Sequence, residues 1–139
     1  MLPPEDPAAF LNKNFHFAVV EVGNDARNLG FQLYSTLKST GFMVSTVNLH
    51  ERIVQGETAF PTIADVRPIP DVIVFTILER EDPQRGINTL KEMRDHGIFR
   101  LWAEPDCASF AMREFAAANA IDLLTSFSLA AELAKQATP

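Results

Sequence analysis

The sequence contains few of the residues on which several common classes of protein depend. Cys107 is its one cysteine, so no intramolecular disulfide can form, as expected in a reducing compartment. Lysine and arginine number 12 against 18 acidic residues, whereas a nucleic-acid binder needs basic side chains to neutralise phosphates. The three histidines are scattered, without companion ligands at metal-binding spacing. We therefore expect no disulfide, no nucleic-acid partner and no metal.

Long hydrophobic runs are missing as well. The most apolar stretch, residues 72–78, is far shorter than the roughly 20 residues that cross a bilayer as a helix. Residues 1–6 carry acids and prolines where a signal peptide needs basic residues before an apolar run. The sequence therefore predicts a cytoplasmic protein without a membrane partner.

What the chain does contain is enough apolar material for one core. Its 139 residues are 47% hydrophobic and 22% charged, which excludes disorder as the main description. A chain of this length buries about two-thirds of its surface and fits one domain. We assign residues 1–14 to an N-terminal arm and residues 15–139 to the domain.

Short apolar runs alternate with helical patterns, which is typical of a parallel sheet with helices on both faces. The runs that predict strands are, in chain order, residues 15–22, 42–49, 58–60, 71–77, 98–102 and 121–124. Between them, helices are indicated by leucine spacing from Leu29 to a stop at Gly41, by a cap at Asp82 followed by Pro83, and by a cap at Ser109. A short closing helix is expected over residues 129–136.

With right-handed crossovers, these elements predict an α/β fold with a single doubly wound, mostly parallel sheet. The strand order is Rossmann-like, 3-2-1-4-5-6, with a short third strand. In such sheets, ligands bind outside the carboxyl ends of the strands, where the strand order reverses. We therefore expect the candidate site at that edge.

The loop after the first strand is the first candidate for ligand binding. Its backbone N–H groups and the positive end of the next helix favour phosphate. Gly23 and Gly30 would let the backbone approach a diphosphate, although they do not form G-x-G-x-x-G. An ordinary strand-to-helix turn explains the same two glycines without a ligand.

Other residues at this edge have two interpretations each. Asn48 stands where dehydrogenases place an acid that binds the ribose hydroxyls. In one interpretation it contacts a ligand and tolerates a phosphorylated ribose. In the other it is a structural turn residue. Surface arginines there could contact phosphates or be solvated. Acids at the same edge would repel an anion or simply flank a helix N-terminus. The arginines are Arg27, Arg52 and Arg80, and the acids are Glu79, Glu81 and Asp82.

No catalytic pattern is evident. Cys107 lies near a predicted helix start, which could lower the pKa of its thiol, but the sequence places no base beside it. Neither G-x-S-x-G, a Walker loop nor a pair of carboxylates at catalytic spacing occurs. We predict that the protein is not an enzyme.

Several short motifs follow one another in a distinctive order. They are Ala18-Val19-Val20, Leu29-Gly30, Val47-Asn48, Phe60-Pro61-Thr62-Ile63-Ala64-Asp65 and Trp102-Ala103-Glu104-Pro105. In order and spacing they resemble the small single-domain CoA-binding proteins, relatives of the nucleotide-binding domain of the succinyl-CoA synthetase alpha subunit. The resemblance covers nearly all of residues 15–129. It implies a Rossmann-type fold and CoA or an acyl-CoA as ligand.

The phosphate loop is degenerate relative to that family. The resemblance places the first loop glycine of the family at Glu21 and its serine at Gly23, unless the loop is two residues shorter and Gly23 takes the glycine role. Further departures replace prolines, a glutamine, a glycine and a cysteine of the family. They fall at Leu49, Leu78, Glu79, Glu104, Asp106 and Ser128.

Two functions follow from these observations. The leading hypothesis is a non-catalytic protein that binds CoA, acyl-CoA or another adenine nucleotide; an NAD-linked enzyme is disfavoured. The alternative is a degenerate Rossmann module that has lost the ligand and acts in protein–protein interaction or assembly. The partner is accordingly a small nucleotide or a protein, and a homo-oligomer is compatible with the sequence. The predicted ligand-binding residues are Glu21, Val22, Gly23, Asn24, Arg27, Gly30, Asn48, Arg52, Leu78 and Trp102.

Overall fold

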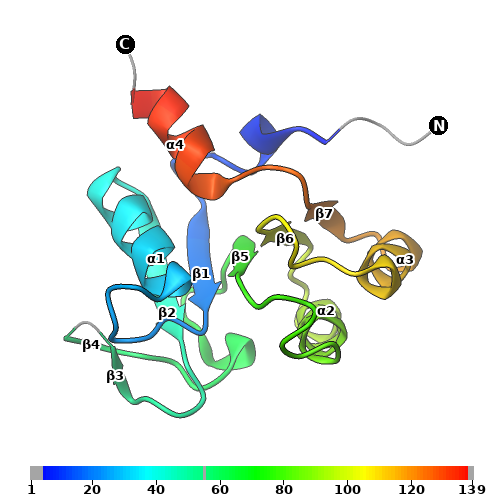
Figure 1. Cartoon of the computed structure of the whole chain (residues 1–139), viewed down its shortest axis with the longest axis horizontal. Coiled ribbons are helices and arrows are strands. Elements are labelled where there is room, and N and C mark those ends of the chain that lie inside the picture. The colour runs from blue at the N-terminus through cyan, green and yellow to red at the C-terminus, as the bar shows by residue number, and fades with distance from the viewer. Residues whose placement is uncertain (1–4, 55, 138–139) are drawn as a thin grey trace.

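A computed structural model describes residues 5–54 and 56–137; residues 1–4 of the predicted arm lie outside the described residues. At its centre is a parallel sheet with the strand order β2-β1-β5-β6-β7 (Figure 1). Every strand of this sheet is short, and β1 and β5 are buried along their whole length. The strands are β1 (His16–Val20), β2 (Met43–Val47), β5 (Val72–Phe75), β6 (Arg100–Ala103) and β7 (Asp122–Leu124).

Helices cover both faces of this sheet. On one face α1 (Leu29–Ser39) and α4 (Leu129–Ala137) pack over a core that includes Phe17, Val19 and Trp102. On the other face α2 (Arg85–Asp95) and α3 (Phe110–Ala118) pack over a second core (Figure 1). The predicted doubly wound α/β class is therefore confirmed.

The predicted strand order is wrong in one respect, because the third strand does not join the sheet. Phe60 alone pairs with Val47, in an isolated parallel bridge at the sheet edge. Pro61 follows directly and lacks the N–H that a longer ladder needs. The segment before it contains the antiparallel pair β3 (Ile53–Val54) and β4 (Glu57–Thr58), which the sequence did not predict.

The helix starts were predicted with mixed success. Ser109 caps α3 as expected, since its side chain accepts a hydrogen bond from the N–H of Met112 at 3.1 Å. The cap at Asp82 is wrong: the carbonyl of Asp82 accepts from the N–H of Arg85 in a turn, and α2 begins at Arg85. Pro83 therefore lies in this turn and not at the first helical position.

The described part of the N-terminal segment packs on the domain. Asp6 caps a short 3-10 helix, Pro7–Ala9, by accepting a hydrogen bond from the N–H of Ala8 at 3.0 Å. Phe10 is buried and meets Trp102 edge to face, with ring centroids 6.0 Å apart. The carboxylate of Glu5 accepts hydrogen bonds from the N–H and hydroxyl of Thr125. These contacts tie the segment to the end of β7 and to the core.

Candidate functional site

A pocket of about 620 Å³ opens at the carboxyl ends of β1, β2, β5 and β6, at the point where the strand order reverses. This is where the topology of an open parallel sheet predicts a ligand, and the volume lies within the range usual for small-molecule sites. Four of the predicted ligand residues line it: Glu21, Gly23, Asn48 and Leu78. It is further lined by Asn28, Leu29, Thr76, Ile77, Glu81, Asp82, Arg85, Pro105 and Cys107.

The backbone at Glu21 has a conformation that normally requires glycine. Its φ is +64°, in the left-handed region that L side chains rarely adopt. Gly23, by contrast, is not among the described glycines with positive φ. This backbone favours the register in which Glu21 stands at the family's glycine position. The same relation holds for Asp106, at φ +70°, where the resemblance also places a glycine.

The Glu21 side chain forms an ion pair that the sequence did not predict. The Nη2 atom of Arg85 donates to Oε1 of Glu21 at 2.6 Å, and the two side chains are 31% and 25% exposed. Arg85 is the first residue of α2, where a cation opposes the helix dipole. A cation at this unfavourable position suggests a residue that needs an anionic partner. The sequence would have indicated this for Arg85 if the start of α2 had been predicted correctly.

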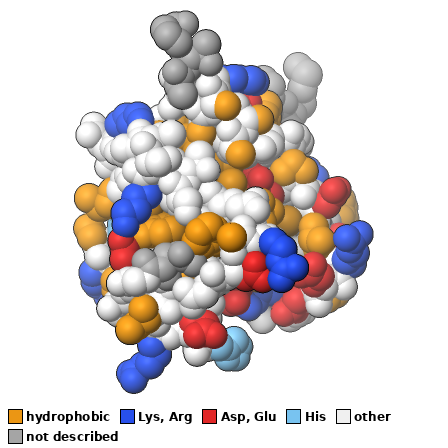
Figure 2. Space-filling view, turned by 60° about the vertical axis from the view of Figure 1, so that its left-hand side comes forward, with side chains coloured by type: hydrophobic (Ala, Val, Ile, Leu, Met, Phe, Trp, Pro, Cys, Tyr) orange, Lys and Arg blue, Asp and Glu red, His pale blue; other side chains and the backbone are white. Residues whose placement is uncertain are grey.

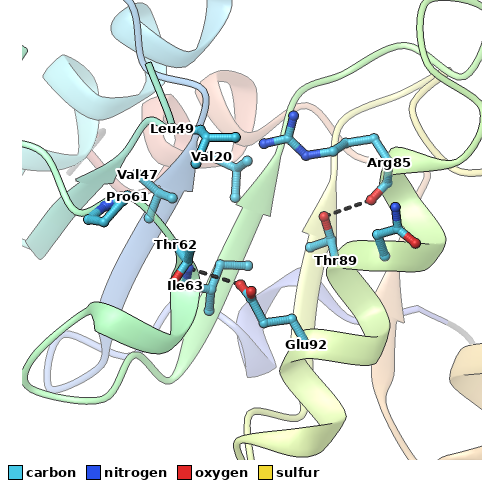
Figure 3. Close-up of a pocket in the computed structure, with 10 residues that line it drawn as sticks. Val20, Val47, Leu49, Pro61, Thr62, Ile63, Arg85, Thr89 and Glu92 are labelled. Carbon is cyan, nitrogen blue, oxygen red and sulfur yellow. Dashed lines mark hydrogen bonds between the residues drawn. The ribbon is translucent and has the colours of Figure 1, made fainter. Parts of the chain in front are cut away.

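Arg85 also borders a second, smaller pocket of about 270 Å³. Figure 3 shows its side chain extending from the start of α2 toward Val20 and Leu49, above the apolar wall formed by the strands. The opposite wall is the face of α2 that carries Thr89 and Glu92. Arg85 therefore lies between the two pockets and contributes to both.

The start of α1 is where we expect a phosphate to bind, but the side chain of Asn28 already accepts hydrogen bonds from backbone N–H groups there. Oδ1 of Asn28 accepts from the N–H of Phe31 at 2.7 Å and from the N–H of Gly23 at 3.0 Å. Gly30 packs tightly behind it, since a Cβ there would lie 3.0 Å from the carbonyl oxygen of Glu21. Asn28 therefore already satisfies one backbone donor of the loop and one of the first turn of α1.

Asn48 uses both ends of its carboxamide within the chain. Nδ2 donates to the carbonyl of Val22 at 3.0 Å, and Oδ1 accepts from the N–H groups of His50 and Glu51 at 2.8 and 2.9 Å. The side chain is buried and joins the ends of β1 and β2. These bonds support the structural interpretation of Asn48, although the residue lines the pocket.

The charges that line the 620 Å³ pocket are mostly negative. Glu21, Glu81 and Asp82 contribute three carboxylates, and Arg85 is the one cation of the lining among the described residues. Three negative charges and one positive charge leave a formal balance of −2. An anionic ligand would find one favourable partner there, and that partner is already paired with Glu21.

Several predicted ligand residues lie outside this pocket. Val22 is fully buried in the core. Asn24 is exposed, and its Nδ2 donates to the carbonyl of Ile53 at 3.3 Å. Arg27 is exposed and pairs with Asp25. Arg52 lines a neighbouring hollow of about 370 Å³, beyond the end of β2.

Trp102 is not brought to the pocket either. Its side chain is fully buried, and its indole N–H lies within hydrogen-bonding distance of Oε2 of Glu104 (3.1 Å) and of the carbonyl of Phe127 (3.0 Å). Oε2 of Glu104 also accepts from the N–H of Leu129 at 2.9 Å. Burial raises the pKa of Glu104, against the opposing effect of these hydrogen bonds. Glu104 therefore joins β6 to α4 inside the core, and does not face a ligand.

The position of Cys107 near a helix start suggested a lowered thiol pKa, but the structure indicates a raised one. The side chain is buried. Burial, followed by the negative charges of Glu104, Asp106 and Glu81, raises the thiol pKa to about 11. The thiol is therefore protonated at neutral pH and is a poor nucleophile. Among the described residues, no group of three His, Cys, Asp or Glu could hold a metal ion.

Comparison with known proteins gives a family match and several similar folds. A family model described as a CoA binding domain matches residues 16–134. A conserved hypothetical protein from Pyrococcus furiosus has 23% identity and a TM-score of 0.77, over 85% of this chain and 98% of the other. A Thermus thermophilus protein has 16% identity and a TM-score of 0.77, over 94% and 95% of the two chains.

A third similar structure belongs to a much larger protein. It is an acetyl-coenzyme A synthetase from Candidatus Korarchaeum cryptofilum, in complex with phosphate and ADP, with 20% identity and a TM-score of 0.68. The match covers 87% of this chain but 27% of the synthetase. The search of curated proteins finds no match. In the part of the chain that the structure describes, no helix is long and apolar enough to cross a membrane.

Proposed function

The chain belongs to the family of CoA-binding domains, and on this premise we propose that it binds CoA or an acyl-CoA at the carboxyl edge of its sheet. The observation that carries the proposal is the 620 Å³ pocket at the reversal of strand order, with the loop after β1 on its wall. The left-handed backbone at Glu21 supports it further, because it retains the geometry of a glycine-containing phosphate loop although the side chain has changed.

The proposed orientation follows from the general behaviour of such sheets. The diphosphate lies at the loop between β1 and α1, and the adenosine end extends past Asn48 toward the hollow that Arg52 lines. Arg52 is exposed, which leaves its guanidinium accessible to a phosphate on the ribose. A ligand in this orientation spans two adjoining hollows that share Asn48.

We further propose that binding is not followed by a reaction. The thiol nearest the pocket, Cys107, has a pKa raised to about 11 and therefore carries little thiolate at neutral pH. His16 lies at the opposite, amino end of β1, where its ring nitrogens bond to Ser45 and Pro68. Neither residue is arranged as a nucleophile or base for a ligand at the carboxyl edge.

A second candidate, a module that binds a protein instead of a nucleotide, is favoured by the −2 balance of the pocket lining. Exposed apolar side chains lie near the same edge: Leu49 is 59% and Ile53 63% exposed. Figure 2 brings forward the side on which α1, β3 and β4 lie in Figure 1, and it shows hydrophobic side chains at that surface. Acidic and apolar residues together would suit a protein surface better than a diphosphate.

The experiment is native mass spectrometry of freshly purified protein, followed by thermal unfolding with CoA and with NAD. We expect CoA to stabilise the fold by about 2.7 kcal/mol at 100 times its Kd, and more than NAD at the same concentration. The reason is that Asn48 provides no carboxylate for the ribose hydroxyls of NAD. Equal stabilisation by NAD would contradict the orientation, and the absence of any CoA effect would favour the protein-binding module.

A further inference from the structure

Arg85 is placed to do more than neutralise Glu21. It begins α2, so its guanidinium and the positive end of the helix lie on the same side of the 620 Å³ pocket. Figure 3 shows the side chain reaching across the neighbouring pocket toward Leu49, which directly follows Asn48. Among the described residues, no other cation lines either of these two pockets.

Two backbone donors near the start of α1 and the arginine of the preceding loop are already engaged within the chain. Asn28 accepts from the N–H of Phe31 and the N–H of Gly23, which are donors that a phosphate would otherwise take. Arg27 is 90% exposed, pairs with Asp25 and does not line the pocket. A diphosphate entering this pocket would therefore depend on Arg85 more than on the loop.

A carboxylate of the chain itself pairs with Arg85. The Glu21 carboxylate lies 2.6 Å from Nη2, the distance of a charge-assisted hydrogen bond. Glu21 is the residue directly after β1, and the resemblance places a glycine of the family at this position. Its backbone has the left-handed conformation that favours glycine. A guanidinium bonds a carboxylate and a phosphate in the same planar, two-pronged geometry, so either anion can satisfy it.

We infer that Arg85 is the residue that binds the diphosphate of the nucleotide, and that Glu21 occupies it until the ligand arrives. This inference rests on the proposed function. Binding is then an exchange of one anion for another at a fixed guanidinium: the Arg85–Glu21 pair opens, the carboxylate turns to solvent, and a phosphate oxygen takes its place. Since both side chains are partly exposed, the exchange does not require the core to open.

Exchange of the Glu21 carboxylate for a phosphate at Arg85 predicts a different result from direct repulsion between Glu21 and the phosphates. If Glu21 weakens binding by occupying Arg85, replacing Glu21 helps only while Arg85 is present. If Glu21 acts by repelling the phosphates directly, replacing it helps more when Arg85 is absent, because the carboxylate is then no longer neutralised. A double-mutant cycle measures the sign of this coupling.

The experiment is calorimetric titration of CoA into the wild type, Glu21→Gln, Arg85→Gln and the double variant, at one salt concentration. We expect Glu21→Gln to tighten binding about fivefold or more, and Arg85→Gln to weaken it about tenfold or more. In the Arg85→Gln background, Glu21→Gln should change the affinity less than about twofold. Arg113→Gln and Glu114→Gln, which change exposed charges on α3, are the matched controls, with circular dichroism to verify folding.

Two results would overturn the inference while leaving CoA binding intact. One is an unchanged CoA affinity in Arg85→Gln. The other is a gain from Glu21→Gln that is equal or larger when Arg85 is replaced. If neither the wild type nor Glu21→Gln binds CoA, the proposed function fails, and the inference fails with it.

Discussion

Replacing Glu104 by glutamine is the sharpest test of how this edge of the sheet is built. The Glu104 carboxylate is 5% exposed and accepts from the indole N–H of Trp102 and the backbone N–H of Leu129. Glutamine keeps the shape and one acceptor oxygen while removing the charge. It is also the residue that the resemblance places at this position. We therefore expect Glu104→Gln to fold and to retain both contacts.

The pKa of Glu104 gives the sign of the pH dependence. Burial raises it above the ordinary value of 4.5, so the folded state binds the proton more tightly than the unfolded chain does. The stability from this group is fully present below pH 4.5 and is lost as the pH rises through the folded-state pKa. Glutamine cannot ionise, so the variant should gain stability relative to the wild type as the pH rises above 4.5.

Glu104→Ala gives the contrasting magnitude. It leaves the Leu129 N–H without its acceptor, whereas the Trp102 indole keeps the carbonyl of Phe127. One unsatisfied buried donor costs about 1–3 kcal/mol, and the lost methylene contacts add about 1 kcal/mol, so we expect a loss of about 2–4 kcal/mol. At roughly 3–5 °C for each kcal/mol, Tm should fall clearly. Glu104→Gln should stay within about 1 kcal/mol of the wild type near pH 5.

Urea unfolding between pH 5 and pH 8, followed by fluorescence, measures these differences, and Trp102 is the single tryptophan. Glu114→Gln, on the exposed surface of α3, controls for the loss of one negative charge. The reasoning is refuted if Glu104→Gln costs as much as Glu104→Ala, or if its difference from the wild type does not change with pH. CoA affinity should be unchanged in Glu104→Gln, since the side chain faces the core.

Two further predictions concern buried titratable groups. Burial lowers the pKa of His16 from 6.5, so its contribution to stability is present above pH 6.5 and is lost as the pH falls through its pKa in the folded state. His16→Gln should therefore flatten the dependence of the urea midpoint on pH below pH 6.5. Cys107, with its pKa raised to about 11, should react with a maleimide far more slowly in the folded protein at pH 8 than in urea, and equal rates would contradict its burial.

The sequence predicted the class of fold because its strongest signals were local. The run over residues 71–77 is apolar without alternation, as in a strand buried on both faces, and it contains β5. Ser109 has the side chain of a helix cap and caps α3. The elements it missed, β3 and β4, are each two residues long, which is too short for a periodic pattern.

The presence of a pocket at this edge was predictable from the sequence, and the contacts within it were not. The topological rule for parallel sheets predicts a pocket at the carboxyl ends of the strands, and the 620 Å³ pocket lies there. The Glu21–Arg85 pair joins residues 64 positions apart, and pairing at such a separation leaves no periodic signal. For Glu104 a signal did exist: strand alternation puts it on the same side as Trp102, which packs in the core.

At two positions of the carboxyl edge, the backbone has a conformation that favours glycine although the residue is acidic. Glu21 and Asp106 both have positive φ, and both stand where the resemblance places glycine. An L residue in this conformation costs roughly 1–2 kcal/mol, so the surrounding structure holds each of them there. At Glu21 part of that cost is offset by Arg85, at 2.6 Å. Glu21 therefore combines a glycine-like backbone conformation with an ion pair to Arg85. Whether that pair competes with a ligand, or Glu21 repels the ligand directly, is what the coupling between Glu21 and Arg85 measures.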